Sequence, residues 1–320
     1  MTATKAVAKI DNSSAVAFEF FGDKVIDEFI ASRHASANTM RTYHNAVKQL
    51  RKFFAAKAIT APTTADVDAF INELRTAKKS NSTLKLYFAT TKLFFSFLAQ
   101  RGYYSDVAAD AAPLKLRKSS THKKAALSTA QAKKLLAAVE GDSRISKRDK
   151  SVVALALTSG LRCCEISRAD VGDFYCDCGD YFLRVQGKGR LSKDEVVRVP
   201  NATAELILAY LKMRGNVSDD SPLFVSESNQ NHGARFSVQS VGKMITRHMK
   251  AAGVHSKNTV TPHSTRHFAA TTAIEAGVDI RQVSQMLRHS NLSVTVVYLH
   301  DLSVRTRRAE ICVANALFAA

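Results

Sequence analysis

Apolar positions in the first third of the chain recur at steps of three and four residues, which is the spacing of one helix face. Two long segments share this repeat: Met40, Tyr43, Val47, Leu50 and Phe54 in the first, and Leu84, Tyr87, Thr91, Phe94 and Leu98 in the second. Helical patterns also cover residues 16–31 and 63–77. The sequence therefore predicts a bundle of four helices, with Asn38 as the N-cap of the second.

Basic side chains follow the two long helices outside the apolar stripe. Arg41, Lys48 and Lys52 lie on the first helix, and Lys85 and Lys92 lie on the second. Such a stripe is either an ordinary solvated face or a surface that contacts a polyanion. We take these five side chains as candidate contacts to a polyanion.

The helical periodicity stops at residues 105–126, where Pro113, paired serines and a basic run indicate a linker. Helical patterns resume at 128–140 and 149–159, and three short β-like runs follow. The β-like runs lie near residues 171–174, 181–186 and 196–200, and helical patterns dominate after residue 202.

These patterns predict a mainly α protein with two domains. The N-terminal domain is a helical bundle, and the second is a mixed α+β domain with a small antiparallel sheet. The expected limits are a flexible leader at 1–14, the bundle at 15–104, the linker at 105–126, and the second domain at 127–320 with a final helix at 309–320.

The net charge indicates a polyanionic partner. The chain has 320 residues, 46 Lys and Arg against 28 Asp and Glu, and a formal charge of +18. The excess is +8 over residues 1–121 and +10 over residues 122–320, so both predicted domains are basic. A charge of this sign and size favours nucleic acid as the partner. No apolar run approaches the ~20 residues of a membrane span, and the first residues lack the apolar core of a signal peptide. We therefore expect a soluble, cytoplasmic, nucleoid-associated protein without a membrane partner.

Several kinds of site are excluded by what the sequence lacks. It has no phosphate-binding GxxxxGK[ST] loop, no clustered carboxylates to hold magnesium and no GxSxG elbow. Cys163 and Cys164 are interpreted as small buried thiols in a reducing compartment. Cys176 and Cys178 have no second pair at zinc spacing. We expect neither a metal site nor a cofactor.

Arginine, histidine and lysine side chains concentrate in three segments of the second domain. These segments are SGLRCCEI, GKGRLSKDE and the long run from TPHSTRH to VVYLH. Guanidinium, imidazole and ammonium groups can neutralise a pentavalent phosphorane without a metal. The set therefore favours phosphodiester chemistry, with candidate residues Arg162, Lys188, His263, Arg266, His289 and Tyr298.

In order and spacing these residues resemble the tyrosine recombinase (phage integrase) family, in the two-domain form of its simple Xer-like and Cre-like members. Arg162 lies in SGLRCCE with Glu165 three residues later, and Lys188 lies in GKGR. An H-x-x-R motif and an H-x8-Y motif follow, formed by His263 and Arg266 and by His289 and Tyr298. The segment at 36–43 is similar to the family's SAM-like core-binding domain.

The resemblance implies strand transfer without ATP or metal. Tyr298 would attack a DNA phosphate and form a 3′-phosphotyrosyl bond, leaving a free 5′-hydroxyl. Arg162 and Arg266 would hold the non-bridging oxygens, and Lys188 would protonate the departing 5′ oxygen. His263 would assist the nucleophile, and His289 would donate a hydrogen bond to the phosphate. Glu165 would support the neighbouring basic side chains.

The resemblance also implies partners and a biological role. The substrate would be double-stranded DNA with inverted-repeat half-sites, bound by a homotetramer that exchanges the helix at 309–320. The reaction would integrate or excise a mobile element or resolve DNA dimers. Two alternatives stay open: a type IB topoisomerase, and a non-catalytic DNA-binding regulator with the same fold.

Other interpretations compete with individual assignments. Lys193 lies in the same loop as Lys188, and His263 with His267 has the i, i+4 spacing of a metal pair, although HExxH is absent. Two residues depart from the family pattern. Arg288 replaces the usual Gly before the second His, which implies strain if φ is positive there. Thr265 replaces a Leu, which would slightly reduce packing under Arg266.

Overall fold

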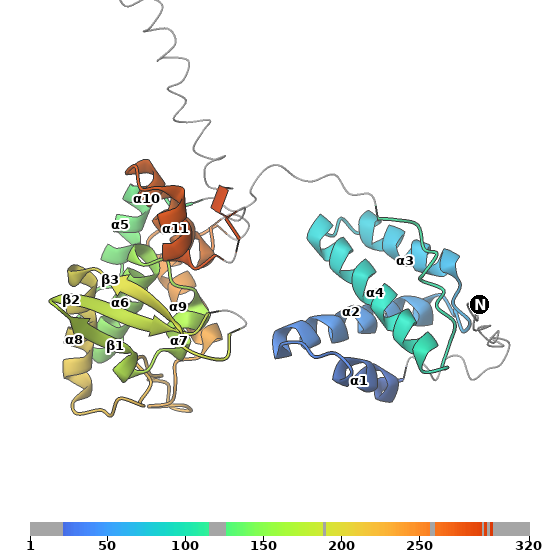
Figure 1. Ribbon diagram of the computed structural model, residues 1–320, viewed down its shortest axis with the longest axis horizontal. Helices are drawn as coiled ribbons and strands as arrows, with labels where there is room; N and C mark the ends of the chain where they lie inside the picture. Colours follow the sequence, from blue (N-terminus) through green and yellow to red (C-terminus); the bar gives the residue numbers. More distant parts are fainter. Residues whose placement is uncertain are drawn as a thin grey trace, which may run out of the picture. The chain divides into compact units, whose positions relative to one another are not determined.

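The computed structural model describes residues 22–114, 126–187, 190–256, 260–289, 291–292 and 295–296. The chain divides into two compact units, Met1–Lys118 and Ser119–Ala320 (Figure 1). Each unit is described by itself, and each has its own apolar core. The linker limits at 105 and 126 remain a prediction, because residues 115–125 of that segment lie outside the described residues.

The first unit is a helical bundle, as expected. Its described helices are α1 (Asp23–Ala31), α2 (Ala37–Ala56), α3 (Thr64–Thr76) and α4 (Asn81–Gln100). The start of the expected helix at 16–31 lies outside the described residues. The predicted apolar stripe of α2 is confirmed, since Val47, Leu50 and Phe54 are fully buried. Aromatic rings close the core between α1 and α4, where Phe29 meets Phe94 edge-on with ring centroids 5.2 Å apart.

Serine residues begin both long helices of this unit. The hydroxyl of Ser36 accepts a hydrogen bond from the backbone N–H of Thr39 at 3.3 Å, and Ser80 does the same for Thr83 at 3.1 Å. The prediction of Asn38 as the N-cap was therefore wrong. Asn38 lies inside the first turn, where the preceding serine already satisfies an N–H that has no partner within the helix.

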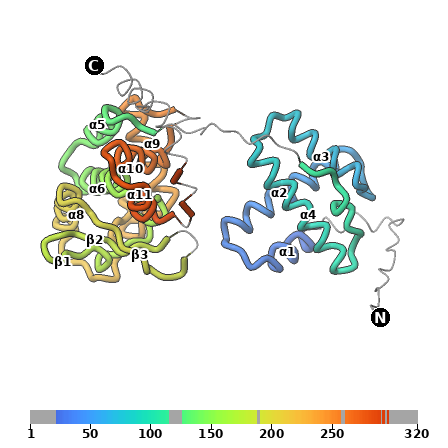
Figure 2. Tube along the Cα trace, turned by 45° about the horizontal axis from the view of Figure 1, so that its top comes forward, coloured from blue at the N-terminus to red at the C-terminus, as the bar shows by residue number. Residues whose placement is uncertain are grey.

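The second unit is built around one buried helix, α6 (Arg144–Thr158). Residues 151–157 of α6 are all buried, so this helix is covered on every side. Figure 2 shows it between α5 (Thr129–Ala137) and α8 (Asn201–Arg214), and it also packs against two further helices. The remaining described helices are α7 (Cys163–Arg168), α9 (Val238–Ala251), α10 (His263–Glu275) and α11 (Ile280–Leu287).

A small antiparallel sheet of three strands completes this unit, as predicted. The strands are β1 (Phe174–Asp177), β2 (Asp180–Val185) and β3 (Glu195–Val199), in the order β1-β2-β3. The first strand, expected near 171–174, begins only at Phe174, because Val171–Asp173 form a 3-10 turn. The carboxylate of Asp173 accepts the backbone N–H of Asp170 at 2.7 Å. This local bond fixes a turn before the strand begins.

In the parts of the chain that the structure describes, no helix has both the length and the apolar character that a membrane crossing requires.

Candidate active site

Arg162 and Glu165 form a closed contact at the start of α7. The carboxylate of Glu165 accepts the backbone N–H of Arg162 at 2.8 Å and its guanidinium Nη1 at 2.7 Å. Glu165 is fully buried, whereas the Arg162 side chain is 23% exposed. The arginine that caps the start of this short helix is therefore anchored by a buried carboxylate and still partly exposed.

Glu165 is ionised although it is buried. Burial by itself favours the neutral acid, but the charge of Arg288 and the N–H and charge of Arg162 outweigh it. Together they hold the pKa of this carboxyl below its usual value. The carboxylate can therefore anchor two guanidiniums throughout the neutral pH range.

Arg266 ties three segments together inside the unit. Its side chain lies on α10 with 1% exposure. Nη1 donates to the carbonyl oxygen of Gly160 at 2.7 Å, and Nη2 donates to that of Leu287. Gly160 has φ +59°, and a Cβ there would lie 2.8 Å from a methyl carbon of Leu287. Glycine is thus required at the turn that leads into Arg162.

His289 follows α11 and faces the same basic cluster. Its Nδ1 lies 2.8 Å from the hydroxyl oxygen of the buried Thr295. Burial lowers the pKa of His289 to about 4, and four nearby basic groups act in the same direction. In order of decreasing effect these groups are Arg266, Arg162, Arg288 and His263. At pH 7 the imidazole is neutral, with one N–H to donate.

His263 is the exposed first residue of α10. Its ring meets that of His267 edge-on, with centroids 4.7 Å apart, while His267 is 4% exposed. Among the described residues there is no group of three or more His, Cys, Asp and Glu that could hold a metal ion. The pair by itself therefore has no further ligands of these types in the described part of the chain.

The two departures from the family pattern are both visible. Arg288 has φ 54° and ψ 49°, so φ is positive at this position, which is the condition under which the sequence implied strain. Its guanidinium is paired with Glu165. Thr265 is 1% exposed, and its hydroxyl donates to the carbonyl oxygen of Pro262 at 2.8 Å. Thr265 thus holds the turn before α10 by a hydrogen bond.

The loop between β2 and β3 contains two lysines, and only one of them can be the candidate general acid. Lys193 is held by the carboxylates of Asp170 and Asp173, and these contacts raise its pKa although partial burial opposes them. An ammonium held in this way is a poor proton donor. This geometry supports Lys188, which itself lies outside the described residues, as does Tyr298.

The five candidate residues of the first unit differ in their surroundings. Arg41, Lys52 and Lys85 are exposed and Lys48 is half-buried. Lys92 instead donates to the carbonyl oxygen of Ala109 at 3.2 Å, with its ammonium 5.1 Å from the ring centre of Phe88. Lys92 is therefore engaged within its own unit, and the roles of all five toward DNA remain predictions.

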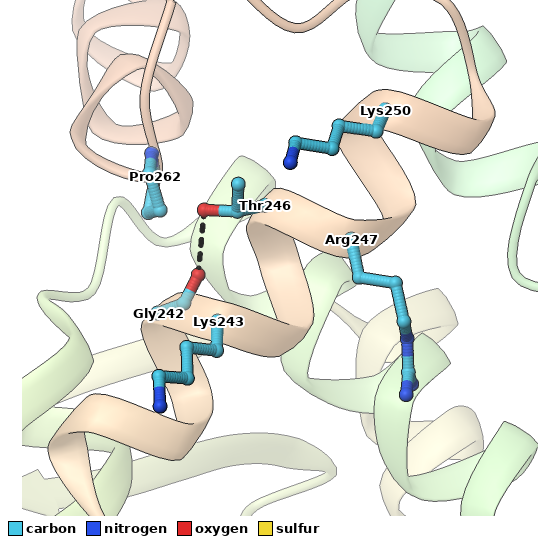
Figure 3. Close-up of a pocket in the computed structure, with 6 residues that line it drawn as sticks. All are labelled: Gly242, Lys243, Thr246, Arg247, Lys250 and Pro262. Atoms are coloured by element: carbon cyan, nitrogen blue, oxygen red, sulfur yellow. Dashed lines mark hydrogen bonds between the residues drawn. The ribbon is translucent and has the colours of Figure 1, made fainter. Parts of the chain in front are cut away.

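A basic pocket on α9 was missed in the sequence. It has a volume of about 500 Å³ and opens beside Pro262, the residue before His263. In Figure 3 the Lys250 side chain extends toward Thr246 and Pro262, whereas the side chains of Lys243 and Arg247 point away from Pro262. Arg247 is bonded to the buried Asp149 at 2.7 Å. The repeat of basic residues at steps of four and three could have revealed this face.

The thiols of this unit are only partly as expected. Cys163 and Cys164 begin α7 and are half-buried, so the prediction of buried thiols holds only in part. Burial, with a contribution from Cys164, raises the pKa of the Cys163 thiol to about 11. A thiol with so high a pKa is unreactive at neutral pH. Cys176 and Cys178 are exposed.

Comparisons with known proteins cover both units. The model of the Phage integrase family matches residues 125–304, and that of the Phage integrase N-terminal SAM-like domain matches residues 26–102. Tyrosine recombinase XerA of Thermococcus kodakarensis is 33% identical over 241 residues, covering 75% of this chain and 78% of that protein. Tyrosine recombinase XerC of Thermodesulfovibrio yellowstonii is 27% identical over 292 residues, covering 88% and 92%.

Solved structures share the fold. The XerH site-specific recombinase, in a post-cleavage complex with a palindromic difH substrate, has a TM-score of 0.71 at 20% identity and covers 94% of this chain and 84% of that one. A lambda integrase tetramer bound to a Holliday junction has a TM-score of 0.62 at 19% identity, with coverages of 86% and 75%.

Proposed function

Because this chain belongs to the phage integrase family and is a tyrosine recombinase, we propose that it cleaves and rejoins DNA strands through a 3′-phosphotyrosyl intermediate. The observation that carries this proposal is the convergence of Arg162, Arg266 and His289: both guanidiniums lie close enough to His289 for their charges to lower its pKa. The arginines come from α7 and α10, and the histidine follows α11, so the fold gathers them from distant parts of the chain. Such a cluster suits a single phosphate with developing negative charge.

The chemistry follows from the groups present. The phenol oxygen of Tyr298 forms a bond to phosphorus, and the bond from phosphorus to the 5′ oxygen breaks. Arg162 and Arg266 stabilise the two non-bridging oxygens, since guanidinium stays charged and donates in a fork. Lys188 gives a proton to the leaving 5′ oxygen, and His263 helps to take one from the phenol.

Neutral His289 donates its N–H to the same phosphate. Because the pKa of His289 is lowered to about 4, this hydrogen bond does not depend on protonation near pH 7. Strand exchange is completed when a 5′-hydroxyl of the partner strand attacks the phosphotyrosyl phosphorus, the bond from phosphorus to the Tyr298 oxygen breaks, and the phenol leaves with a proton. The phosphotyrosyl ester keeps the energy of the original bond, so religation needs no ATP.

Double-stranded DNA is the proposed partner of both units. The exposed Lys243 and Lys250 border a pocket beside the residue that precedes His263, so a backbone that crosses α9 can reach the catalytic cluster. Arg41, Lys52 and Lys85 supply a second basic face. Binding should weaken with salt at a log–log slope near −0.9 for each neutralised phosphate.

We further propose that four copies assemble on two DNA sites with inverted-repeat half-sites, through exchange of residues 309–320. The lambda integrase structure with the same fold is a tetramer on a Holliday junction. The segment at 309–320 contains Ile311, Val313, Leu317 and Phe318, an apolar set suited to docking in a groove of a neighbour.

Removal of residues 309–320 should therefore abolish recombination and leave binding of one copy to a half-site within about twofold. The physical reason is that the truncation takes away a contact between copies and no proposed phosphate contact. Gel-shift titration against one and two half-sites, run beside a recombination assay, measures both effects. Recombination at the full rate by the truncated chain would refute the exchange.

Genome-wide mapping of the covalent adduct tests the biological role. Cells expressing the protein are lysed in detergent, the DNA attached to protein is enriched, and the linked 3′ ends are sequenced. Tyr298→Phe serves as the background. Adducts at the ends of a mobile element would indicate integration and excision, and one site per replicon would indicate dimer resolution. No enrichment above the Tyr298→Phe background would contradict the proposed function at its first step. Either positive result would place the protein on the nucleoid in the cytoplasm.

A further inference from the structure

Arg288 occupies a strained and buried position directly before His289. Its backbone lies in the left-handed region, at φ 54° and ψ 49°, where the Cβ of a residue other than glycine comes too close to the carbonyl oxygen that follows. Its side chain is only 4% exposed. A long charged residue held in this way must be stabilised by its contacts.

Those contacts are directed at the anchor of Arg162. Nη1 of Arg288 donates to the carbonyl oxygen of Met286 at 2.6 Å, which braces the guanidinium against its own turn. Nη2 donates to Oε2 of Glu165 at 2.6 Å, across 123 residues of sequence. Because the guanidinium is buried and directed to these groups, it acts on the reaction through another residue.

Glu165 is thus shared between two arginines. Its Oε1 accepts from Nη1 of Arg162 at 2.7 Å, while its Oε2 accepts from Arg288. Two guanidiniums around one carboxylate leave a net positive charge. Arg162 with Glu165 alone would leave none, and the attraction of the pair for a phosphate would be weaker.

We propose that Arg288 is a positioning residue for DNA cleavage, which neutralises Glu165 so that Arg162 presents its positive charge to the scissile phosphate. This inference rests on the role proposed above for Arg162. It also gives a reason for a bulky residue at a backbone position that favours glycine.

A second ion pair provides a matched control. Nε of Arg288 lies 3.7 Å from Oε2 of Glu195, on the first residue of β3. The side chain of Glu195 is 26% exposed, whereas that of Glu165 is fully buried. Glu195→Gln therefore weakens a contact of Arg288 without altering Glu165, and we expect it to change cleavage by no more than about fivefold.

The experiment compares two substrates that differ by one charge. Single-turnover cleavage is measured on a duplex carrying the mapped site, with either a normal scissile phosphodiester or a methylphosphonate. The methylphosphonate replaces one non-bridging oxygen by a methyl group and is neutral. A defect in positive charge should matter less for this substrate, whereas a general loss of structure should affect both equally.

Arg288→Gln is expected to slow cleavage of the phosphodiester by about 10- to 100-fold, the usual effect of removing a group that orients a functional one. The loss of cleavage rate on the methylphosphonate should be at least fivefold smaller than the loss on the phosphodiester. A factor of about five corresponds to a weak charge interaction. Arg288→Lys, which keeps the charge, should recover most of the rate. Arg288→Gly relieves the backbone strain, so it provides a folded variant without the charge even if the Gln variant unfolds.

Equal losses on both substrates, or a normal rate in both Arg288→Gln and Arg288→Gly, would overturn the inference. Arg162→Gln separates this failure from that of the proposed function. If Arg162→Gln abolishes cleavage and the Arg288 variants do not alter it, only the role of Arg288 is wrong. If Arg162→Gln itself cleaves normally, the proposed site is wrong.

Discussion

Replacement of Arg266 by lysine is expected to reduce single-turnover strand cleavage by about 10²- to 10³-fold, the usual effect of losing a donor to developing negative charge. Lysine keeps the charge but cannot donate in a planar fork. The native guanidinium is 1% exposed and bonded to the carbonyl oxygens of Gly160 and Leu287. A lysine ammonium that donates to one of these carbonyl oxygens would leave the other carbonyl oxygen, or the phosphate, without a hydrogen-bond donor.

Arg214 provides a matched control for that substitution. It ends α8, and its Nη1 donates to the carbonyl oxygens of Pro222 and Leu223 at 2.6 and 3.1 Å. Arg214→Lys should cost a similar free energy of unfolding, about 2 kcal/mol, and leave the cleavage rate unchanged. Thermal melting and single-turnover cleavage of both variants separate stability from chemistry. Cleavage by Arg266→Lys at the rate of Arg214→Lys would contradict the role of Arg266.

Substitution of Gly160 by alanine is expected to damage both stability and cleavage. A Cβ at this position would lie 2.8 Å from a methyl carbon of Leu287, and φ is +59°. Backbone strain of about 1 kcal/mol and overpacking of about 1–3 kcal/mol act together. The turn that must shift carries the carbonyl oxygen bonded to Arg266 and leads into Arg162, so cleavage should fall about 100-fold.

Gly253→Ala is the corresponding control. Gly253 has φ +67°, and a Cβ there would meet no atom within 4 Å. This variant should lose only about 1 kcal/mol of stability and cleave at the normal rate. Denaturant unfolding and DNA cleavage are measured for both alanine variants. The difference between the two variants gives the effect of the steric clash with Leu287, because both have a positive φ. Equal stability of the two alanine variants would show that the close approach of Leu287 has no effect.

Local sequence patterns were sufficient for most of the secondary structure. The repeat through Val47, Leu50 and Phe54 predicted a buried helix face, and these residues are buried. The errors lie at ends and turns. Ser36 was overlooked as a cap in favour of Asn38, and the strand expected at 171–174 is a turn closed by Asp170 and Asp173. Such choices depend on single hydrogen bonds between side chains and backbone, which periodicity does not encode.

The motifs gave the candidate residues of the site but not how they are held. Nothing local indicates that Arg288 reaches Glu165, because the two residues are 123 positions apart in the sequence. The engagement of Lys193 by Asp170 and Asp173 likewise required the structure. Both contacts arise from packing between distant segments, whereas motif spacing reports only order along the chain.

Trapping of the covalent intermediate shows directly whether Tyr298 becomes joined to DNA. Purified protein is incubated with a duplex that carries the mapped site and a nick close to the cleavage position. After cleavage, the short fragment that bears the free 5′-hydroxyl diffuses away, so religation is prevented. A denaturing gel then separates free protein from protein joined to DNA. We expect an adduct that forms without metal or ATP, is attached at Tyr298 and is absent in Tyr298→Phe. An adduct that persists in Tyr298→Phe, or no adduct on cognate DNA, would contradict this expectation.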